Sequence, residues 1–303
     1  RAGAFIVHPL MITSIVATLP GCFAVGPDYK PPHIATPTEW SERLRRGLSA
    51  AEPEAETLVQ WWSTLGDSEL SNLIERARAG NLELKRAQAR IREARGRRGI
   101  AASGFYPAFG FSASANVSRS SENAGSGQRS ELNRTGFDAS WEIDVFGGVR
   151  RSVEAAQADL DASVADFDDL MVTLLAEVAL NYVDTRTLQA QLQVAEENLK
   201  AQAETLQLTE WRFAAGLVSR LDVEQAKANL ENTRAQLPRL RSNIEAAKNR
   251  LAILLGVFPG ALEAQLAART PIPQAPLEVA VGVPAEMLRR RPDVRRAERQ
   301  LAA

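Results

Sequence analysis

Residues 137–145 read Phe-Asp-Ala-Ser-Trp-Glu-Ile-Asp-Val, and the chain then runs from Val149 to Ala215 without a glycine or a proline. In the first stretch every odd residue is apolar and every even residue is polar. This period of two predicts a β-strand with one apolar and one polar face. The second stretch predicts a single helix of about 100 Å, at about 1.5 Å per residue. A strand that leads directly into a very long helix predicts a mainly α fold.

A second strand is expected before this one. Apolar or small residues fall on odd positions here too: Phe109, Phe111, Ala113, Ala115 and Val117. Residues 118–134 are rich in Ser, Asn and Gly, which is typical of a loop. Two alternating stretches around a polar loop predict a β-hairpin over about residues 105–146.

The two faces of this hairpin differ in chemistry. The polar face is predicted to carry Asp138, Ser140, Glu142 and Asp144. The apolar face is predicted to carry Phe137, Trp141, Ile143 and Val145. This pattern fits a membrane barrel with lipid outside and water inside, and the alternative is a soluble hairpin that packs on a helix. In a barrel the four polar residues would line the lumen, where an acidic lining would disfavour anions, and the four apolar ones would face lipid.

The long helices are predicted to form a helical hairpin. Apolar residues between 160 and 199 step by three and four, as in a coiled coil, and others lie off that line, so the helix needs two neighbours. The chain turns at residues 214–219, where Gly216 suits a helix end and Ser219 the next N-cap. The second helix keeps the same step from 223 to 254, and Pro238 should kink it and remove one hydrogen bond.

Two shorter helices are expected before the hairpin. Asp67 or Ser68 is a suitable N-cap for the first, and Gly80-Asn81 should end it. The second is predicted from about Leu82 to Ala102.

The N-terminus is predicted to be an export signal over residues 1–21. An apolar stretch without acids ends in Leu19-Pro20-Gly21-Cys22. This stretch is too short for a spanning helix and is typical of a secretory leader. Its end resembles a bacterial lipobox, and this resemblance implies cleavage before Cys22 and lipidation of its sulfur. An ordinary signal with a chance cysteine is the alternative. Because Phe23 rather than Asp follows, the resemblance implies the outer membrane.

Composition removes several classes of function. The 303 residues hold 36 Lys and Arg against 37 Asp and Glu, so the main electrostatic driver of nucleic-acid binding is missing. Two histidines and one cysteine exclude an internal disulfide and a Cys/His zinc site. No nucleophile–base–acid set or phosphate loop is visible, so no enzyme activity is expected. The acids Glu177, Asp166, Asp168 and Asp169 are interpreted as solvated or interhelical charges, and no metal or cofactor is expected besides the covalent lipid.

The predicted organisation has five parts. A lipid-anchored tether over residues 22–66 precedes a first repeat over 67–260, and a Pro-rich crossover occupies 261–287. Residues 293–301 echo residues 83–91, so 288–303 is expected to begin a second, truncated repeat.

The chain is similar to the TolC-like outer-membrane efflux channels, in the NodT/OprM-type lipoprotein branch of RND tripartite efflux systems. Four stretches carry the resemblance: Cys-Phe-Ala-Val-Gly-Pro-Asp-Tyr-Lys-Pro at 22–31, residues 137–148, Arg-Phe-Ala-Ala-Gly-Leu-Val-Ser-Arg-Leu-Asp-Val at 212–223, and Leu-Arg-Arg-Arg-Pro-Asp-Val at 288–294. With the matching helices they cover nearly all of residues 20–303.

The resemblance implies a homotrimer in the outer membrane of a Gram-negative bacterium. Each subunit would give strands to a shared transmembrane β-barrel and long helices to a periplasmic tunnel. The trimer would be a passive export duct for drugs or other small molecules, with a periplasmic adaptor and an inner-membrane RND-type transporter as partners. The turn Gly216, Leu217, Val218 and Ser219 would meet the adaptor, unless it is a plain helical corner; Arg220 and Asp222 beside it could add closed-state ion pairs. The alternatives are a type I protein secretion duct and a structural coiled-coil lipoprotein without a pore.

Overall fold

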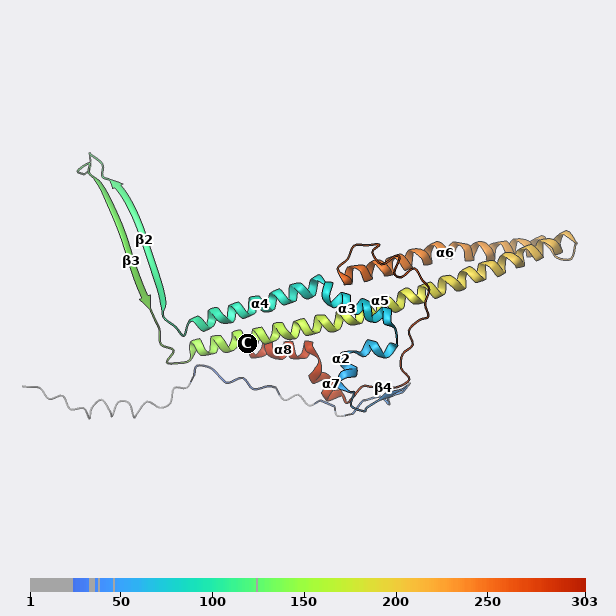
Figure 1. Cartoon of the computed structure of the whole chain (residues 1–303), viewed down its shortest axis with the longest axis horizontal. Coiled ribbons are helices and arrows are strands. Elements are labelled where there is room, and N and C mark those ends of the chain that lie inside the picture. Colours follow the sequence, from blue (N-terminus) through green and yellow to red (C-terminus); the bar gives the residue numbers. More distant parts are fainter. Residues whose placement is uncertain (1–23, 33–35, 38, 46, 124) are drawn as a thin grey trace, which may run out of the picture. The chain divides into compact units, whose positions relative to one another are not determined.

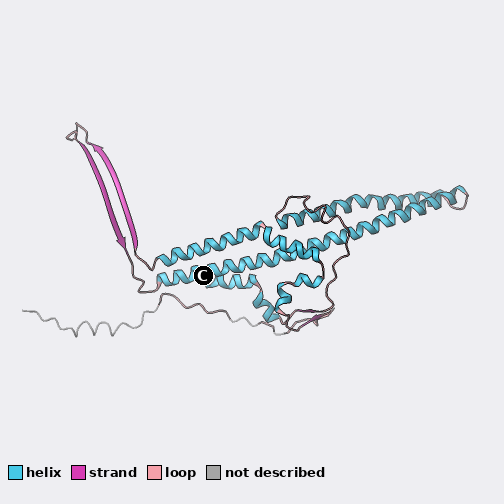
Figure 2. Ribbon diagram, viewed as in Figure 1, coloured by secondary structure: helices cyan, strands magenta, loops and turns pink. Residues whose placement is uncertain are grey.

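The computed structural model describes residues 24–32, 36, 37, 39–45, 47–123 and 125–303, and helices dominate it (Figures 1 and 2). Its main elements are α3 (Ser68–Gly80), α4 (Leu82–Ser103), β2 (Ala108–Arg119), β3 (Arg129–Ser140), α5 (Gly148–Ala214) and α6 (Arg220–Leu255). Shorter elements are β1 (Leu48–Ser49), α2 (Ala55–Val59), η1 (Trp61–Leu65), β4 (Val279–Ala280), α7 (Pro284–Arg290) and α8 (Pro292–Ala302). None of the helices among the described residues has the length and apolar composition needed to cross a membrane.

The chain divides into two compact units. Among the described residues, one unit comprises residues 24–32, Arg90–Ser163 and Ala297–Ala303, and the other comprises residues 36–89 and Val164–Arg296. The second unit holds the main core, where α3, α5 and α6 meet. Its members include Leu70, Leu73, Ile74, Ala77, Leu174, Val178, Tyr182, Leu251, Ala252, Leu255, Leu262 and Leu266.

Local capping fixes where α3 and α4 begin. Asp67 is the N-cap of α3, and its carboxylate accepts a hydrogen bond from the Leu70 amide at 2.9 Å, as expected. The buried Asn81 then separates the two helices. Its side chain accepts from the Leu84 amide at 3.0 Å and donates to the Leu254 carbonyl at 2.9 Å, so it joins the start of α4 to the end of α6.

The end of α3 and the end of α6 approach closely through glycines. A Cβ on Gly80 would lie 2.3 Å from the Leu255 carbonyl oxygen, and one on Gly256 would lie 2.6 Å from that of Gly80. Gly256 also has a φ of +70°, which favours glycine. This contact needs glycine at both positions.

The predicted crossover at residues 261–287 is more than a linker. Its first residues return to the core, where Leu262 and Leu266 are buried. The buried Arg186 donates to Gln189 at 2.9 Å and to the Ala268 carbonyl at 2.7 Å, and Gln189 donates to the Leu266 carbonyl at 2.7 Å. The sequence did not reveal these contacts, because the bonded residues are 82 and 77 positions apart in the chain.

The predicted tether at residues 22–66 is likewise not wholly extended. β1 pairs in parallel with β4, with Leu48 opposite Val279, and the Trp40 indole donates to the Gly282 carbonyl at 2.9 Å. The segment also contains α2 and η1, and Trp62 of η1 is buried in the core.

The two long helices have the predicted bounds. α5 is continuous over 67 residues, and α6 continues as one helix through Pro238. A second apolar cluster of Leu192, Ala195, Leu237 and Ile244 joins them. The three–four spacing therefore marks a real contact line.

Candidate functional site

One face of the hairpin β2–β3 is apolar along β2 and at Phe137 and Ala139 of β3, whereas Thr135, Asn133 and Glu131 make the β3 side of that face polar towards the loop. The opposite face is mostly polar. The antiparallel register pairs Phe109 with Ala139, Phe111 with Phe137 and Val117 with Glu131. Because directly opposed residues share a face, the odd residues of both strands lie together. The Phe111 and Phe137 rings pack at 4.9 Å between centroids, yet Phe109 is 82% and Phe137 87% exposed. The apolar face therefore has no cover within this part of the chain.

The polar face carries charges of both signs. Asp138 lies opposite Gly110, where an added Cβ would meet its carboxylate at 2.6 Å. Arg134 lies opposite Ser114 on the same face. Sequence reasoning missed Arg134 because the Ser/Asn/Gly-rich stretch at 118–134 predicts a loop. That prediction is wrong from Arg129, where β3 begins. The even spacing between residues 134 and 138 was the signal that could have found Arg134.

The predicted strand across residues 137–145 is wrong beyond Ser140. Ser140 pairs with Ala108, so the next partner would be Pro107, which has no amide hydrogen to donate. Trp141, Glu142, Ile143, Asp144 and Val145 therefore follow the strand and do not continue it. These five residues alternate in polarity but do not form a strand, so alternation no longer supports lumen-lining or lipid-facing roles for them. Phe137, Asp138 and Ser140 do lie on β3.

Asp144 has a local role at the start of α5. Its carboxylate accepts hydrogen bonds from the amides of Arg150 at 2.9 Å and Val149 at 3.2 Å. These bonds satisfy helix N-terminal donors and hold the pKa of Asp144 below its ordinary value, the Arg150 amide having the largest effect.

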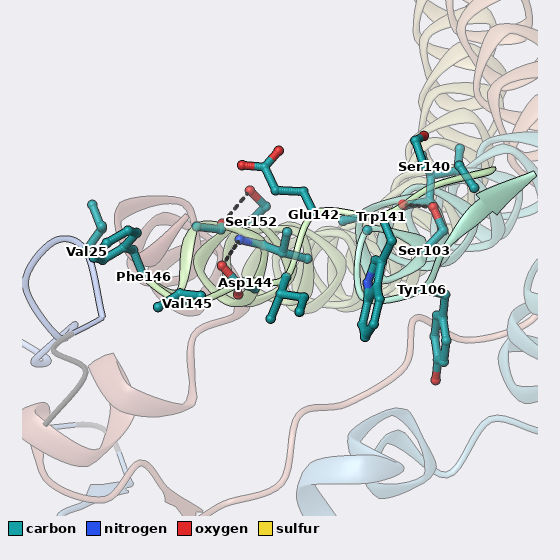
Figure 3. Close-up of a pocket in the computed structure, with 17 residues that line it drawn as sticks. Val25, Ser103, Tyr106, Ser140, Trp141, Glu142, Asp144, Val145, Phe146 and Ser152 are labelled. Carbon is teal, nitrogen blue, oxygen red and sulfur yellow. Dashed lines mark hydrogen bonds between the residues drawn. The ribbon is translucent and has the colours of Figure 1, made fainter. Parts of the chain in front are cut away.

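An open hollow of about 920 Å³ lies at the base of the hairpin, here meaning the residues just before β2 and residues 141–146 after β3 (Figure 3). Tyr106 and Trp141 line it together with Asp144 and Phe146. Both Tyr106 and Trp141 are exposed, so this level of the hairpin carries amphipathic aromatic side chains.

The turn between α5 and α6 is a tightly capped corner. The Leu217 amide donates to the Arg212 carbonyl and the Gly216 amide to the Phe213 carbonyl, both at 2.9 Å, and Gly216 has a φ of +73°. This is a Schellman motif. Ser219 then begins α6 in a capping box with Asp222, whose carboxylate accepts from the Ser219 amide at 2.8 Å and from its hydroxyl at 2.7 Å. These bonds, the hydroxyl first, hold the pKa of Asp222 below its usual value.

The corner exposes apolar side chains. Leu217 and Leu221 are each 74% exposed, Trp211 and Phe213 are also exposed, and Val218 is half-buried. Arg220 comes no nearer than 3.8 Å to Glu224 within its own helix. Asp222 serves the cap of α6.

The remaining predicted residues fall in different places. Cys22 lies outside the described residues. Asp166 and Asp169 pair with Arg296 at 2.6 and 3.4 Å, and Asp168 is 4.0 Å from Arg295, which agrees with interhelical charges. Within the described ranges, no group of three or more His, Cys, Asp or Glu side chains is placed to hold a metal ion.

The chain belongs to the outer membrane efflux protein family, which it matches over residues 73–257. The solved structure of the outer-membrane channel OprN has a TM-score of 0.80 to it at 35% identity, over 92% of this chain and 62% of that one. These matches confirm the predicted family and fold class, and the prediction that the chain is not an enzyme.

Three curated relatives give context. Nodulation protein T of Rhizobium leguminosarum bv. trifolii is 35% identical over 94% of this chain and 60% of its own length. The pyoverdine export outer membrane protein OpmQ of Pseudomonas putida is 34% identical over 89% and 58%. SilC of Salmonella typhimurium, named a probable outer membrane lipoprotein, is 26% identical over 97% and 62%. The chain thus spans about 60% of the length of the first of these relatives.

Proposed function

We propose that the chain is the first repeat of an outer-membrane channel subunit that acts as a passive export duct for small molecules in a tripartite efflux pump. The observation that carries this proposal is the hairpin β2–β3, in which the apolar side chains of β2 and Phe137 of β3 share one face and are exposed. The apolar or small odd positions of β2 alone run from Phe109 to Val117, about 27 Å at about 3.4 Å per residue, close to the height of a membrane barrel's apolar band.

Two strands cannot meet the requirements of a membrane alone. An unpaired strand edge leaves N–H and C=O groups without partners, and hydrocarbon offers none. The hairpin therefore needs further strands on both sides. A second repeat and two more subunits would supply them in a homotrimer with a shared barrel, and Asp138, Ser140 and Arg134 would then face its lumen.

The repeat boundaries have support from the helices. α4 begins at Leu82 and α8 at Pro292, each one residue before the stretch that the sequence repeats. This correspondence supports a first repeat over 67–260 and the start of a second at 288–303.

The helix tip would dock the pump's adaptor. Gly216 and the Ser219–Asp222 box make a rigid corner, and Leu217 presents an uncovered apolar side chain on it. A periplasmic adaptor and an inner-membrane RND-type transporter would complete the pump. The name of the OpmQ relative supports export of a small molecule.

A lipid on Cys22 would anchor the chain in the outer membrane. Each buried methylene contributes about 0.8 kcal/mol, so several acyl chains make a stable anchor. The lipobox-like ending and the name of the SilC relative support this part of the proposal.

Planar-bilayer recording of the full-length protein tests the function. We expect ion-conducting, heat-resistant oligomers, and we expect deletion of residues 108–140 to abolish conductance while the helical content of the remainder persists. Oligomers without conductance would reject the duct and favour a structural coiled-coil lipoprotein.

A further inference from the structure

The residues that follow the proposed lipid site are docked on the first unit. Residues 24–29, here called the strap, contain the motif Gly-Pro-Asp-Tyr, for which the proposed duct gives no role. The Val25 amide donates to the Phe146 carbonyl at 2.8 Å, and both residues line the hollow at the hairpin base. A Cβ on Gly147, which has a φ of +77°, would lie 2.9 Å from that of Ala24. The strap therefore begins in contact with the hairpin base.

One guanidinium group binds the next part of the strap. Arg151, in the first turn of α5, donates to the carbonyls of Val25 at 3.0 Å and Gly26 at 3.4 Å. The same side chain pairs with Asp28 at 2.5 Å. Three acceptors from four consecutive residues suit the planar fork of arginine, which a lysine cannot reproduce.

The position of Arg151 favours such pairing. A cation in the first turn of a helix is disfavoured by the positive end of the helix dipole. Asp28 and Glu154, both bound to Arg151, offset that charge. The hydrogen bond from Arg151 holds the pKa of Asp28 below its ordinary value.

The far end of the strap contacts a different element. The Tyr29 hydroxyl donates to Glu298 of α8 at 3.3 Å, and the Arg299 guanidinium lies 5.7 Å from the Tyr29 ring centroid. The strap thus links the hairpin base, the start of α5 and α8, and each residue of its Asp-Tyr motif has a defined partner.

We propose that Arg151 is the positioning residue that docks the strap on the hairpin base, so that a lipid carried by residue 22 enters the bilayer beside the hairpin and not at the end of a free tether. The lipid rests on the proposed function, whereas the docking does not.

A nitroxide label at Lys30→Cys in the full-length protein tests the docking. Lys30 is exposed, and Cys22 would be blocked by its lipid. We expect a slow label in the parent protein and severalfold faster motion in Arg151→Gln. Arg150→Gln is the matched control, because it removes the same charge one residue away and its side chain makes no hydrogen bond in the described part of the chain. Arg151→Lys should fall between the two.

Two further variants separate the explanations. Asp28→Asn should also mobilise the label, and adding it to Arg151→Gln should have little further effect. Because Asp28 is exposed, this variant tests the idea even if Arg151→Gln fails to assemble. A Cys22→Ala protein exported with an ordinary leader should keep a slow label.

The proposal is overturned if the label moves equally in the Arg150 and Arg151 variants, or if loss of Cys22 mobilises it as much as Arg151→Gln does. A strap that depends on Arg151 in a protein without conductance would reject the duct and leave the docking intact.

Discussion

The core around α3 and the hairpin β2–β3 place their apolar side chains in opposite environments. Leu73 and Ile74 are fully buried against α5 and α6, whereas Phe109 and Phe137 are exposed to more than four-fifths. The first region is complete within its own chain. The second is not, because an isolated two-stranded hairpin is marginal in water. In the proposed channel, this exposed surface would meet lipid and neighbouring strands.

Their polar groups differ in the same way. In the core unit, Asn81, Arg186 and Gln189 are buried and bond to backbone carbonyls of distant residues. On the hairpin, Asp138 and Arg134 remain exposed. Polar side chains therefore link distant segments in the core unit, whereas on the hairpin they are exposed to solvent.

Truncation at the core should have the largest effect. Leu73→Ala leaves a cavity, and we expect the free energy of unfolding of the helices to fall by about 4 kcal/mol. Phe137→Ala should change it by less than about 0.5 kcal/mol. Urea unfolding followed by far-UV circular dichroism measures both. Similar losses in the two variants would remove the contrast between the regions.

A charge introduced on the apolar face of the hairpin should have the second largest effect. Ala113→Lys lies mid-strand, where a lysine facing lipid costs about 2–3 kcal/mol, so less protein should reach the heat-resistant membrane form. Ser112→Lys is the control on the opposite face and should insert normally. Equal insertion of both variants would mean that neither face meets lipid.

The helix tip combines a rigid corner with an exposed apolar residue. Leu217→Asp should lower in vivo cross-linking to the adaptor by about tenfold, as for loss of an interface hot spot of about 1.4 kcal/mol. Glu224→Gln, at an exposed position of α6 outside the turn, should leave cross-linking largely unchanged. Loss of oligomer assembly in Leu217→Asp would show that the turn is only a structural corner.

The two charges on the polar face should shift ion selectivity in opposite directions. Asp138→Asn should lower the preference for cations and Arg134→Gln should raise it, each by no more than about twofold, since mobile ions screen both charges. Reversal potentials under a salt gradient measure this. Shifts of the same sign, or none, would contradict a lumen-facing position.

The capping box at the tip should give the smallest effect, and it should depend on pH. Because the pKa of Asp222 is lower in the folded chain, its contribution is complete above the unfolded value of about 3.9 and is lost as pH falls through the native value. Hydrogen-exchange protection in the first turn of α6 should therefore fall in acid. Asp222→Asn should remove this dependence, whereas Glu224→Gln should keep it.

Sequence reasoning succeeded where the signal was local. The caps Asp67 and Ser219, the positive φ of Gly216 and the bounds of α5 follow from residues within one turn of each other. It failed at Trp141–Val145, where alternation continued but the partner strand reached Pro107. Alternation is a property of one segment, whereas a strand also needs a partner segment that can form hydrogen bonds with it.

By itself, the sequence determined the helical hairpin, its capped corner, the alternation along β2 and at Phe137–Ser140 of β3, and a family confirmed by comparison. Each depends on contacts between near neighbours or on a regular period. Only the tertiary structure decided that β3 stops at Ser140, that Arg134 shares a face with Asp138, that residues 262–268 return to the core, and that the strap meets Arg151. Most of these contacts join residues far apart in the chain, and their proximity depends on how the intervening helices and strands pack.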